Sequence, residues 1–227
     1  MQSAKNQVIA KKGRETRLRH KGMSVKVFEV KVLKNHLDAA TLEKLRRVFI
    51  EAKWFTNDVI AQGPFNANYR IKKVQVKVGD SFEDREVSIL SSQMKQSIID
   101  GIKMDIVNLS KAKKNGKKVG KLKFRKHVET IQLKQYGITY KIIDKLHIRV
   151  QNIGILKVNG LDQIPDNAEI ANAQLINRHN DYYIHITTFI PYETKKLNGM
   201  HIGMDLGIKT QVTLSNGIKV EYSPRKK

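Results

Sequence analysis

Between residues 128 and 190, the spacing of apolar residues constrains the fold more than any other feature of the chain. Five or six short runs rich in β-branched and aromatic residues follow one another there, with turn residues between them. Such a succession of short strands is typical of a small antiparallel barrel or sandwich, and barrels of the OB type often bind single-stranded nucleic acid. We therefore expect a β-barrel. The predicted strands are 130–133, 139–143, 145–150, 155–158, 173–178 and 182–188, with Asn180 and Asp181 as the turn before the last.

Two segments upstream have helical spacing instead. The first begins after Asp38, a plausible N-cap, and its apolar residues recur every three or four positions until Gly63. The second begins at Ser91 or Ser92, whose hydroxyls can cap a helix, and keeps the same spacing to Leu109. We predict two long amphipathic helices.

Further strands flank these helices. Residues 24–33 are rich in valine and alternate well enough for a strand. Residues 73–78 alternate strictly, Gly79 and Asp80 supply a turn, and residues 86–90 alternate again, which predicts a hairpin between the two helices. The expected fold class is therefore α+β.

The charge balance predicts a polyanionic partner. The chain carries 43 Lys and Arg against 21 Asp and Glu, a net charge of +22. The solubility of a small domain needs a net charge of only about 2–8, so a merely solvated basic surface is a weak explanation. Binding to nucleic acid, with a steep dependence on salt, is expected because each neutralised phosphate releases counterions.

The N-terminal 23 residues form a basic arm with almost no apolar periodicity. Such an arm can become ordered on a phosphate backbone, or it can be a disordered leader without a dedicated role, and the sequence leaves both open. Its basic residues are Lys5, Lys11, Lys12, Arg14, Arg17, Arg19 and Lys21.

A dense lysine cluster follows the second helix, with Phe124 inside it and no acidic residue. Lysines this close repel one another unless an anion lies between them, which favours a track for phosphates over a solvated charge run. The cluster consists of Lys111, Lys113, Lys114, Lys117, Lys118, Lys121, Lys123, Arg125 and Lys126.

Trp54, the only tryptophan, is not on the main apolar face of the first helix. At 100° per residue it is on the opposite side with Ile50, beside Arg47. An indole next to a guanidinium can stack on an unpaired base, and packing against a neighbouring domain is the alternative. Arg47 and Trp54 are therefore candidate nucleic-acid-binding residues.

Two absences narrow the class of protein. The sequence has no cysteine, which excludes disulfides and cysteine-ligated zinc or iron–sulfur sites. It also has no run of about 18 apolar residues and no apolar segment of the kind found in signal peptides. We expect a cytoplasmic protein without a membrane partner.

Asp205 is the candidate catalytic and metal-binding residue. It stands in an apolar strand between Gly203 and Gly207, where a carboxylate is costly to bury unless it is paired or bound to a metal. The first strand of an RNase H-like fold has this pattern, and its aspartate bridges two Mg²⁺ ions. Sugar-kinase and actin-like folds begin with a similar strand. Asn216 and Gly217 predict a hairpin turn after it.

From about residue 24 to residue 227, the chain resembles the N-terminal half of TnpB proteins, the RNA-guided nucleases of OrfB-type transposons and relatives of type V CRISPR effectors. The helical segment, basic run, barrel strands and nuclease strand occur in the same order as in that family. The motifs that carry the resemblance are Ser92-Gln93-Met94-Lys95-Gln96, Lys117-Lys118-Val119-Gly120-Lys121-Leu122-Lys123-Phe124, Gly160-Leu161-Asp162-Gln163-Ile164-Pro165 and Gly203-Met204-Asp205-Leu206-Gly207.

The resemblance implies a wedge-like antiparallel β-barrel, interrupted by a helical recognition insertion and followed by the first strands of a RuvC-type, RNase H-like domain. The partners that it implies are a guide RNA and a target DNA, read through base pairing rather than through base-specific protein contacts. The expected division is a basic arm (1–23), the first part of the barrel (24–37), the helical insertion with its hairpin (38–116), the rest of the barrel (117–198) and the start of the nuclease domain (199–227).

The sequence departs from the family at the nuclease site. It ends 22 residues after Asp205, so the nuclease domain is expected to be truncated, and Glu221 is too close to Asp205 to serve as the second carboxylate. One carboxylate cannot hold two Mg²⁺ ions, so we expect no tightly bound metal and no nuclease activity from this chain alone. The alternatives are one half of a split endonuclease completed by a second chain, or a nonspecific RNA-binding relic.

Overall fold

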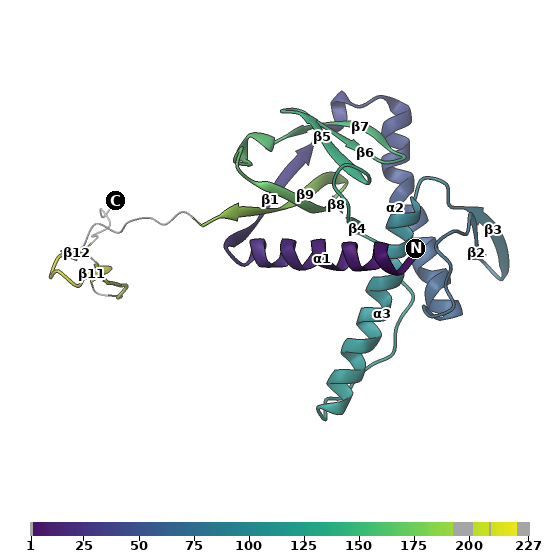
Figure 1. Cartoon of the computed structure of the whole chain (residues 1–227), viewed down its shortest axis with the longest axis horizontal. Helices are drawn as coiled ribbons and strands as arrows, with labels where there is room; N and C mark the ends of the chain where they lie inside the picture. The colour runs from purple at the N-terminus through teal and green to yellow at the C-terminus, as the bar shows by residue number, and fades with distance from the viewer. Residues whose placement is uncertain (1, 193–201, 209, 222–227) are drawn as a thin grey trace, which may run out of the picture. The chain divides into compact units, whose positions relative to one another are not determined.

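The computed structural model describes residues 2–192, 202–208 and 210–221. The chain divides into two compact units, residues 1–192 and residues 193–227, and each is described by itself. Figure 1 shows the first unit as a curled sheet with helices packed beside it.

The sheet of the first unit is antiparallel and barrel-like, nearly closed on itself, with the strand order β4-β8-β9-β1-β7-β6-β5. Its central strand β1 pairs with β9 from Met23↔Pro191 to Lys31↔Tyr183, and with β7 at its far end. The α+β class and the small antiparallel barrel are thus confirmed. The strands are β1 Met23–Val32, β4 Thr130–Leu133, β5 Tyr140–Asp144, β6 His147–Val150, β7 Gly154–Asn159, β8 Glu169–Arg178 and β9 Asp181–Pro191.

Helices α2 (Ala39–Gln62) and α3 (Ser92–Lys114) lie between β1 and β4 in sequence, and their caps are where the sequence predicts them. The Asp38 carboxylate accepts a hydrogen bond from the Thr41 amide at 2.8 Å, and the Ser91 hydroxyl accepts one from Met94 at 3.3 Å. Gly63 ends α2 with a φ of 84°, a conformation that favours glycine. The apolar faces of both helices join one hydrophobic core with the strands. Two short 3-10 turns, Lys34–His36 and Leu161–Gln163, complete the unit.

The hairpin between the helices differs from the prediction in its second strand. Strand β2 covers Lys73–Val78 as expected, but β3 covers Ser81–Glu86, so the predicted strand over 86–90 is wrong. The reason is a buried carboxylate on α2: Glu51 accepts hydrogen bonds from the amides of Ile89 and Leu90, both at 2.9 Å. These amides are therefore not available for a strand ladder.

A buried lysine fixes the same region from the other helix. The Lys95 ammonium on α3, only 5% exposed, donates hydrogen bonds to the carbonyls of Ile71 at 2.8 Å and Val87 at 2.9 Å. Burial lowers the pKa of Lys95, and the nearby Glu51 carboxylate partly opposes that shift. Glu51 and Lys95 together attach the base of the hairpin to the helices.

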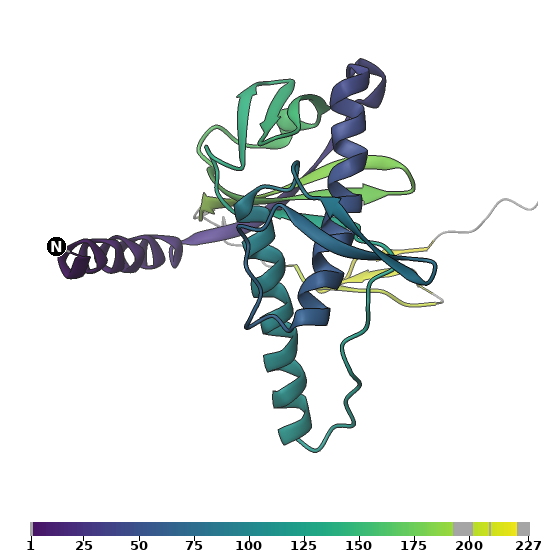
Figure 2. The same cartoon turned by 90° about the vertical axis from the view of Figure 1, so that its right-hand side faces the viewer.

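The N-terminal arm is a helix, α1 (Gln2–His20), which extends away from the barrel (Figure 2). Its last turn is attached to the sheet. Arg19 pairs with Glu169 at 2.8 Å, and the His20 ring stacks on Phe189 with 3.6 Å between centroids. The basic side chains from Lys11 onward are mostly exposed, in keeping with the lack of apolar periodicity.

In the second unit, three short antiparallel strands form a sheet in the order β10-β11-β12. They are β10 Met204–Asp205, β11 Val212–Leu214 and β12 Lys219–Val220. The predicted turn at Asn216 and Gly217 is confirmed, with a φ of 88° at Gly217. Asp205 lies on the two-residue strand β10 and is exposed, so in the described residues its carboxylate does not carry the cost of burial that the sequence pattern raised.

Within the described parts of both units, no helix has the length and apolar character that crossing a membrane requires.

Candidate nucleic-acid interface

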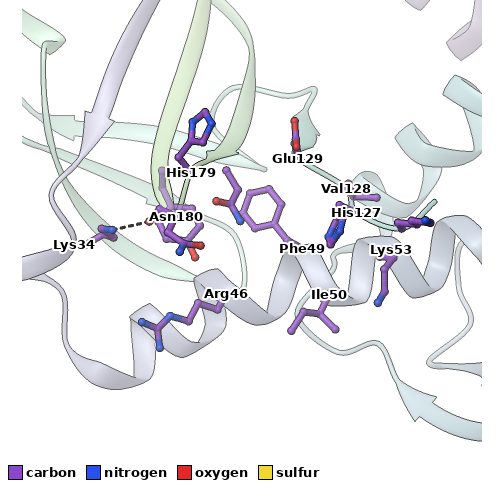
Figure 3. Close-up of a pocket in the computed structure, with 13 residues that line it drawn as sticks. Lys34, Arg46, Phe49, Ile50, Lys53, His127, Val128, Glu129, His179 and Asn180 are labelled. Carbon is purple, nitrogen blue, oxygen red and sulfur yellow. Dashed lines mark hydrogen bonds between the residues drawn. The ribbon is translucent and has the colours of Figure 1, made fainter. Parts of the chain in front are cut away.

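A cavity of about 760 Å³ lies where α2, the turn between β8 and β9, and residues 126–129 meet (Figure 3). We call it the basic groove, since four Lys and Arg side chains and two histidines line it. Among the described residues of its lining, Glu129 is the only acid. The lining is Lys34, Arg46, Phe49, Ile50, Lys53, Lys126, His127, Val128, Glu129, Asn177, His179, Asn180 and Tyr182.

One end of the groove is a tight hairpin turn. His179 and Asn180 both have positive φ, 52° and 64°, and they connect the paired residues Arg178 and Asp181. Positive φ at both central residues is the geometry of a type I′ turn, which matches the twist of the strands. The predicted turn at Asn180-Asp181 is thus wrong by one residue, because Asp181 already belongs to β9.

Lys34 holds this turn in place. Its ammonium donates to the Asn180 carbonyl at 2.6 Å and pairs with the Asp181 carboxylate at 2.8 Å. Hydrogen bonds from Lys34 and Lys31 lower the pKa of Asp181. The end of the groove therefore has a defined shape before any ligand binds.

The floor of the groove is aromatic. Phe49 on α2 and Tyr182 on β9 stack with 5.8 Å between centroids, and both are nearly buried. Burial raises the pKa of the Tyr182 hydroxyl, and the positive charge of Arg46 opposes this rise. The groove is therefore lined by both cationic side chains and a packed aromatic pair.

Part of the predicted lysine cluster joins the groove through a clamp on α2. The side-chain amide of Asn57 donates to the Arg125 carbonyl at 3.0 Å and accepts from the Arg125 amide at 2.7 Å. The Arg125 guanidinium also lies 3.8 Å from the Asp105 carboxylate of α3. This attachment brings Lys126 and His127 to the lining.

The remaining predicted cluster residues lie elsewhere. The last turns of α3 project from the first unit, and the segment after them returns beside the helix, with Leu122 near Leu109 (Figures 1 and 2). The side chains of these residues are exposed to solvent, and none of them lines the basic groove. They are Lys111, Lys113, Lys114, Lys117, Lys118, Lys121 and Lys123.

Arg47 and Trp54 are adjacent, as their spacing predicts. The Arg47 guanidinium carbon lies 4.6 Å from the centroid of the Trp54 ring, and Arg47 also approaches the buried Glu51 carboxylate at 3.6 Å. Trp54 is half-buried and packs partly against the hydrophobic core. It also lines a second cavity, so core packing does not account for all of its surface.

We call this second cavity, of about 750 Å³, the aromatic pocket. It shares Lys53, Lys126 and His127 with the basic groove, so the two cavities are neighbours. The residues of its lining are Lys53, Trp54, Asn57, Asp58, Ala61, Gln62, Gln75, Val76, Lys77, Phe82, Phe124, Arg125, Lys126 and His127.

Several lining residues were not predicted. A signal for some of them was present in α2, because Arg46, Ile50, Lys53 and Asn57 recur at helical spacing on the side that also carries Trp54. Lys34, His179 and Phe82 had no comparable signal, since they reach the two cavities only through tertiary pairing.

Asp205 does not fit a metal centre by itself. In the described parts of the chain, no group of three or more His, Cys, Asp or Glu side chains is placed to hold a metal ion. Glu221 accepts a hydrogen bond from the Thr210 hydroxyl at 3.0 Å. An exposed single carboxylate does not supply the ligands that a pair of Mg²⁺ ions needs.

Comparison with known proteins identifies no family. No protein-family model matches the chain. No curated protein matches it either. The resemblance to TnpB proteins therefore stays a hypothesis.

Proposed function

We propose that this chain binds nucleic acid in the basic groove, as the part of a TnpB-like RNA-guided protein that holds guide RNA and target DNA. The observation that carries the proposal is the convergence of basic side chains from four segments of the chain, spread from residue 34 to residue 179. Lys34 and His179 come from the ends of barrel strands, Arg46 and Lys53 from α2, and Lys126 from the basic segment. Phosphates are the anions that such a groove accepts best.

The arrangement of elements supports the TnpB-like part of the proposal. A helical segment interrupts a barrel between its first strand and the others, and a small sheet carrying Asp205 follows. This is the order that the resemblance implies. A groove beside a barrel suits binding through the backbone of a duplex or strand, with base pairing supplying sequence.

We also propose that Asp205 is the first-strand aspartate of an RNase H-like domain. Because the described residues around it do not form a metal site, the activity expected of this chain is binding without cleavage.

Salt-dependent binding tests the groove. We expect the double variant Lys53→Gln/Lys126→Gln to bind a labelled RNA–DNA duplex more weakly, with the slope of log K against log salt reduced by about 1.4–1.8, the loss of two phosphate contacts. Lys141→Gln, an exposed lysine on β5 outside the groove, is the matched control. An unchanged slope in the double variant would refute binding in this groove.

The identity of the nucleic acid needs a second experiment. The chain is crosslinked in its host and purified, and the bound RNA is sequenced. A single discrete RNA is the result expected of a guide-binding protein. A broad sample of cellular RNA would overturn the guide-RNA part of the proposal and leave general binding in the groove.

A further inference from the structure

Two strongly exposed aromatic side chains meet at the aromatic pocket, and neither has a structural role in the core. Phe82 on β3 is 66% exposed, and Phe124 in the basic segment is 65% exposed. Both line the same cavity as Trp54, although they come from separate parts of the chain. Exposed aromatic residues gathered at one cavity mark a binding site rather than scattered surface residues.

The lining of the pocket is also basic. Lys53, Lys77, Arg125 and Lys126 line it with His127, and Asp58 is the only acid among its described lining residues. A purely apolar ligand or an apolar peptide would offer no counter-charge to these side chains. The occupant that matches both the aromatic and the cationic side chains of the lining is a flat aromatic ring attached to phosphates, which is a nucleotide.

The lining of the pocket also includes uncharged and acidic polar groups. Asp58 and Gln75 line it from α2 and β2, and the Asp58 carboxylate accepts hydrogen bonds from Gln62 at 2.9 Å. Binding sites for small ligands combine a mostly apolar lining with a few such polar groups, and a volume of about 750 Å³ is within their usual range.

The neighbouring groove supplies the path for the strand. Since Lys53, Lys126 and His127 line both cavities, phosphates bound in the basic groove would lie next to the aromatic pocket. The Asn57 clamp on Arg125 holds the segment between Phe124 and Lys126 on α2, so the wall shared by the two cavities is fixed in position.

We propose that the aromatic pocket holds one unpaired nucleobase of the bound nucleic acid, in contact with Trp54 and Phe124, while the adjoining phosphates lie in the basic groove. The inference deepens the proposed function and depends on it. It gives the exposed Phe82 and Phe124 side chains a role in ligand binding, in addition to the attraction between the basic side chains and phosphates. Contact with the base is independent of its identity, because every base has a π-face.

Trp54 is the only tryptophan, so its fluorescence reports on this pocket alone. The probes are an oligo-adenylate of about eight nucleotides and an abasic strand of the same length, each as RNA and as DNA. We expect the adenylate to quench Trp54 and to bind about 5- to 150-fold more tightly than the abasic strand. Quenching of Trp54 by the RNA or by the DNA adenylate supports the proposal. The adenylate that binds more tightly identifies the kind of strand that supplies the base.

Variants at exposed positions separate the pocket from the groove. Phe124→Ala should lose most of the preference for the base-containing strand and retain the salt slope, whereas Phe124→Tyr should keep both. Phe65→Ala is the matched control, because Phe65 is 72% exposed and lies outside the pocket.

Three outcomes would overturn the inference. Equal quenching and affinity with adenylate and abasic strands would show that the pocket holds no base, while binding in the groove would stand. If Phe124→Ala keeps the whole preference for the adenylate over the abasic strand, the base binds outside the aromatic pocket. If neither strand binds even at low salt, the inference fails, and if the RNA–DNA duplex does not bind either, the proposed function fails with it.

Discussion

Replacing the buried Lys95 with methionine should destabilise the first unit strongly. Methionine fills a similar volume but donates no hydrogen bond, so the carbonyls of Ile71 and Val87 lose their partner. Hydrogen bonds from a charged group contribute about 1.5–3 kcal/mol each. The Glu51 carboxylate, 1% exposed, also loses the nearest buried positive charge of α3. Removing one partner from a buried charged network costs about 3–5 kcal/mol, and we expect a loss of this size.

Urea unfolding monitored by circular dichroism measures this loss. Thermal unfolding should show the same loss as a lower Tm. For a chain of this size each kcal/mol lowers Tm by about 2–4 °C, so we expect a decrease of roughly 6–20 °C. The matched control is Lys111→Met on the exposed side of α3, which should change the free energy of unfolding by less than about 0.5 kcal/mol. A loss below about 1 kcal/mol for Lys95→Met would refute the reasoning that this network attaches the hairpin to the helices.

Three further predictions concern the clamp, the barrel and the second unit. Asn57→Leu removes both hydrogen bonds to Arg125, so we expect about 1–3 kcal/mol less stability and weaker oligonucleotide binding, measured by urea unfolding and fluorescence anisotropy; unchanged affinity would contradict the role of the clamp. Burial raises the pKa of Tyr140, whose hydroxyl donates to the Ala171 carbonyl at 2.8 Å. The folded state therefore keeps this proton above pH 10 while the unfolded state releases it, and stability should fall there by about 1.4 kcal/mol per pH unit from this group. Tyr140→Phe should lack that component, and an identical alkaline slope in both proteins would contradict it. Asp205→Ala should leave RNA binding unchanged, and the unaltered chain should cleave no DNA in Mg²⁺; cleavage that disappears in the variant would overturn the view that this chain binds without cutting.

The hairpin connects stability with ligand binding. Phe82 is on β3, and the base of that hairpin is attached through Glu51 and Lys95. Loss of the buried network should therefore weaken the preference for base-containing strands more than it weakens binding to phosphates. The same attachment holds one wall of the aromatic pocket against α2.

The sequence by itself determined the elements whose signals are local. Asp38, Gly63 and Ser91 mark helix ends through bonds and backbone angles that involve near neighbours, so both ends of α2 and the start of α3 follow from a few residues. The barrel strands were also predictable, because alternation of apolar residues is set within each strand. The side of α2 that carries Arg47 and Trp54 followed from helical spacing in the same way.

Tertiary structure alone decided the candidate site. Asn57 pairs with Arg125 across 68 positions, and this contact selects which end of the lysine cluster reaches the groove. Glu51 takes the amides of Ile89 and Leu90 across about 38 positions and so moves the second hairpin strand. A local pattern contains no information about which distant polar group satisfies a buried amide, because that choice is made only when the helices and strands pack together.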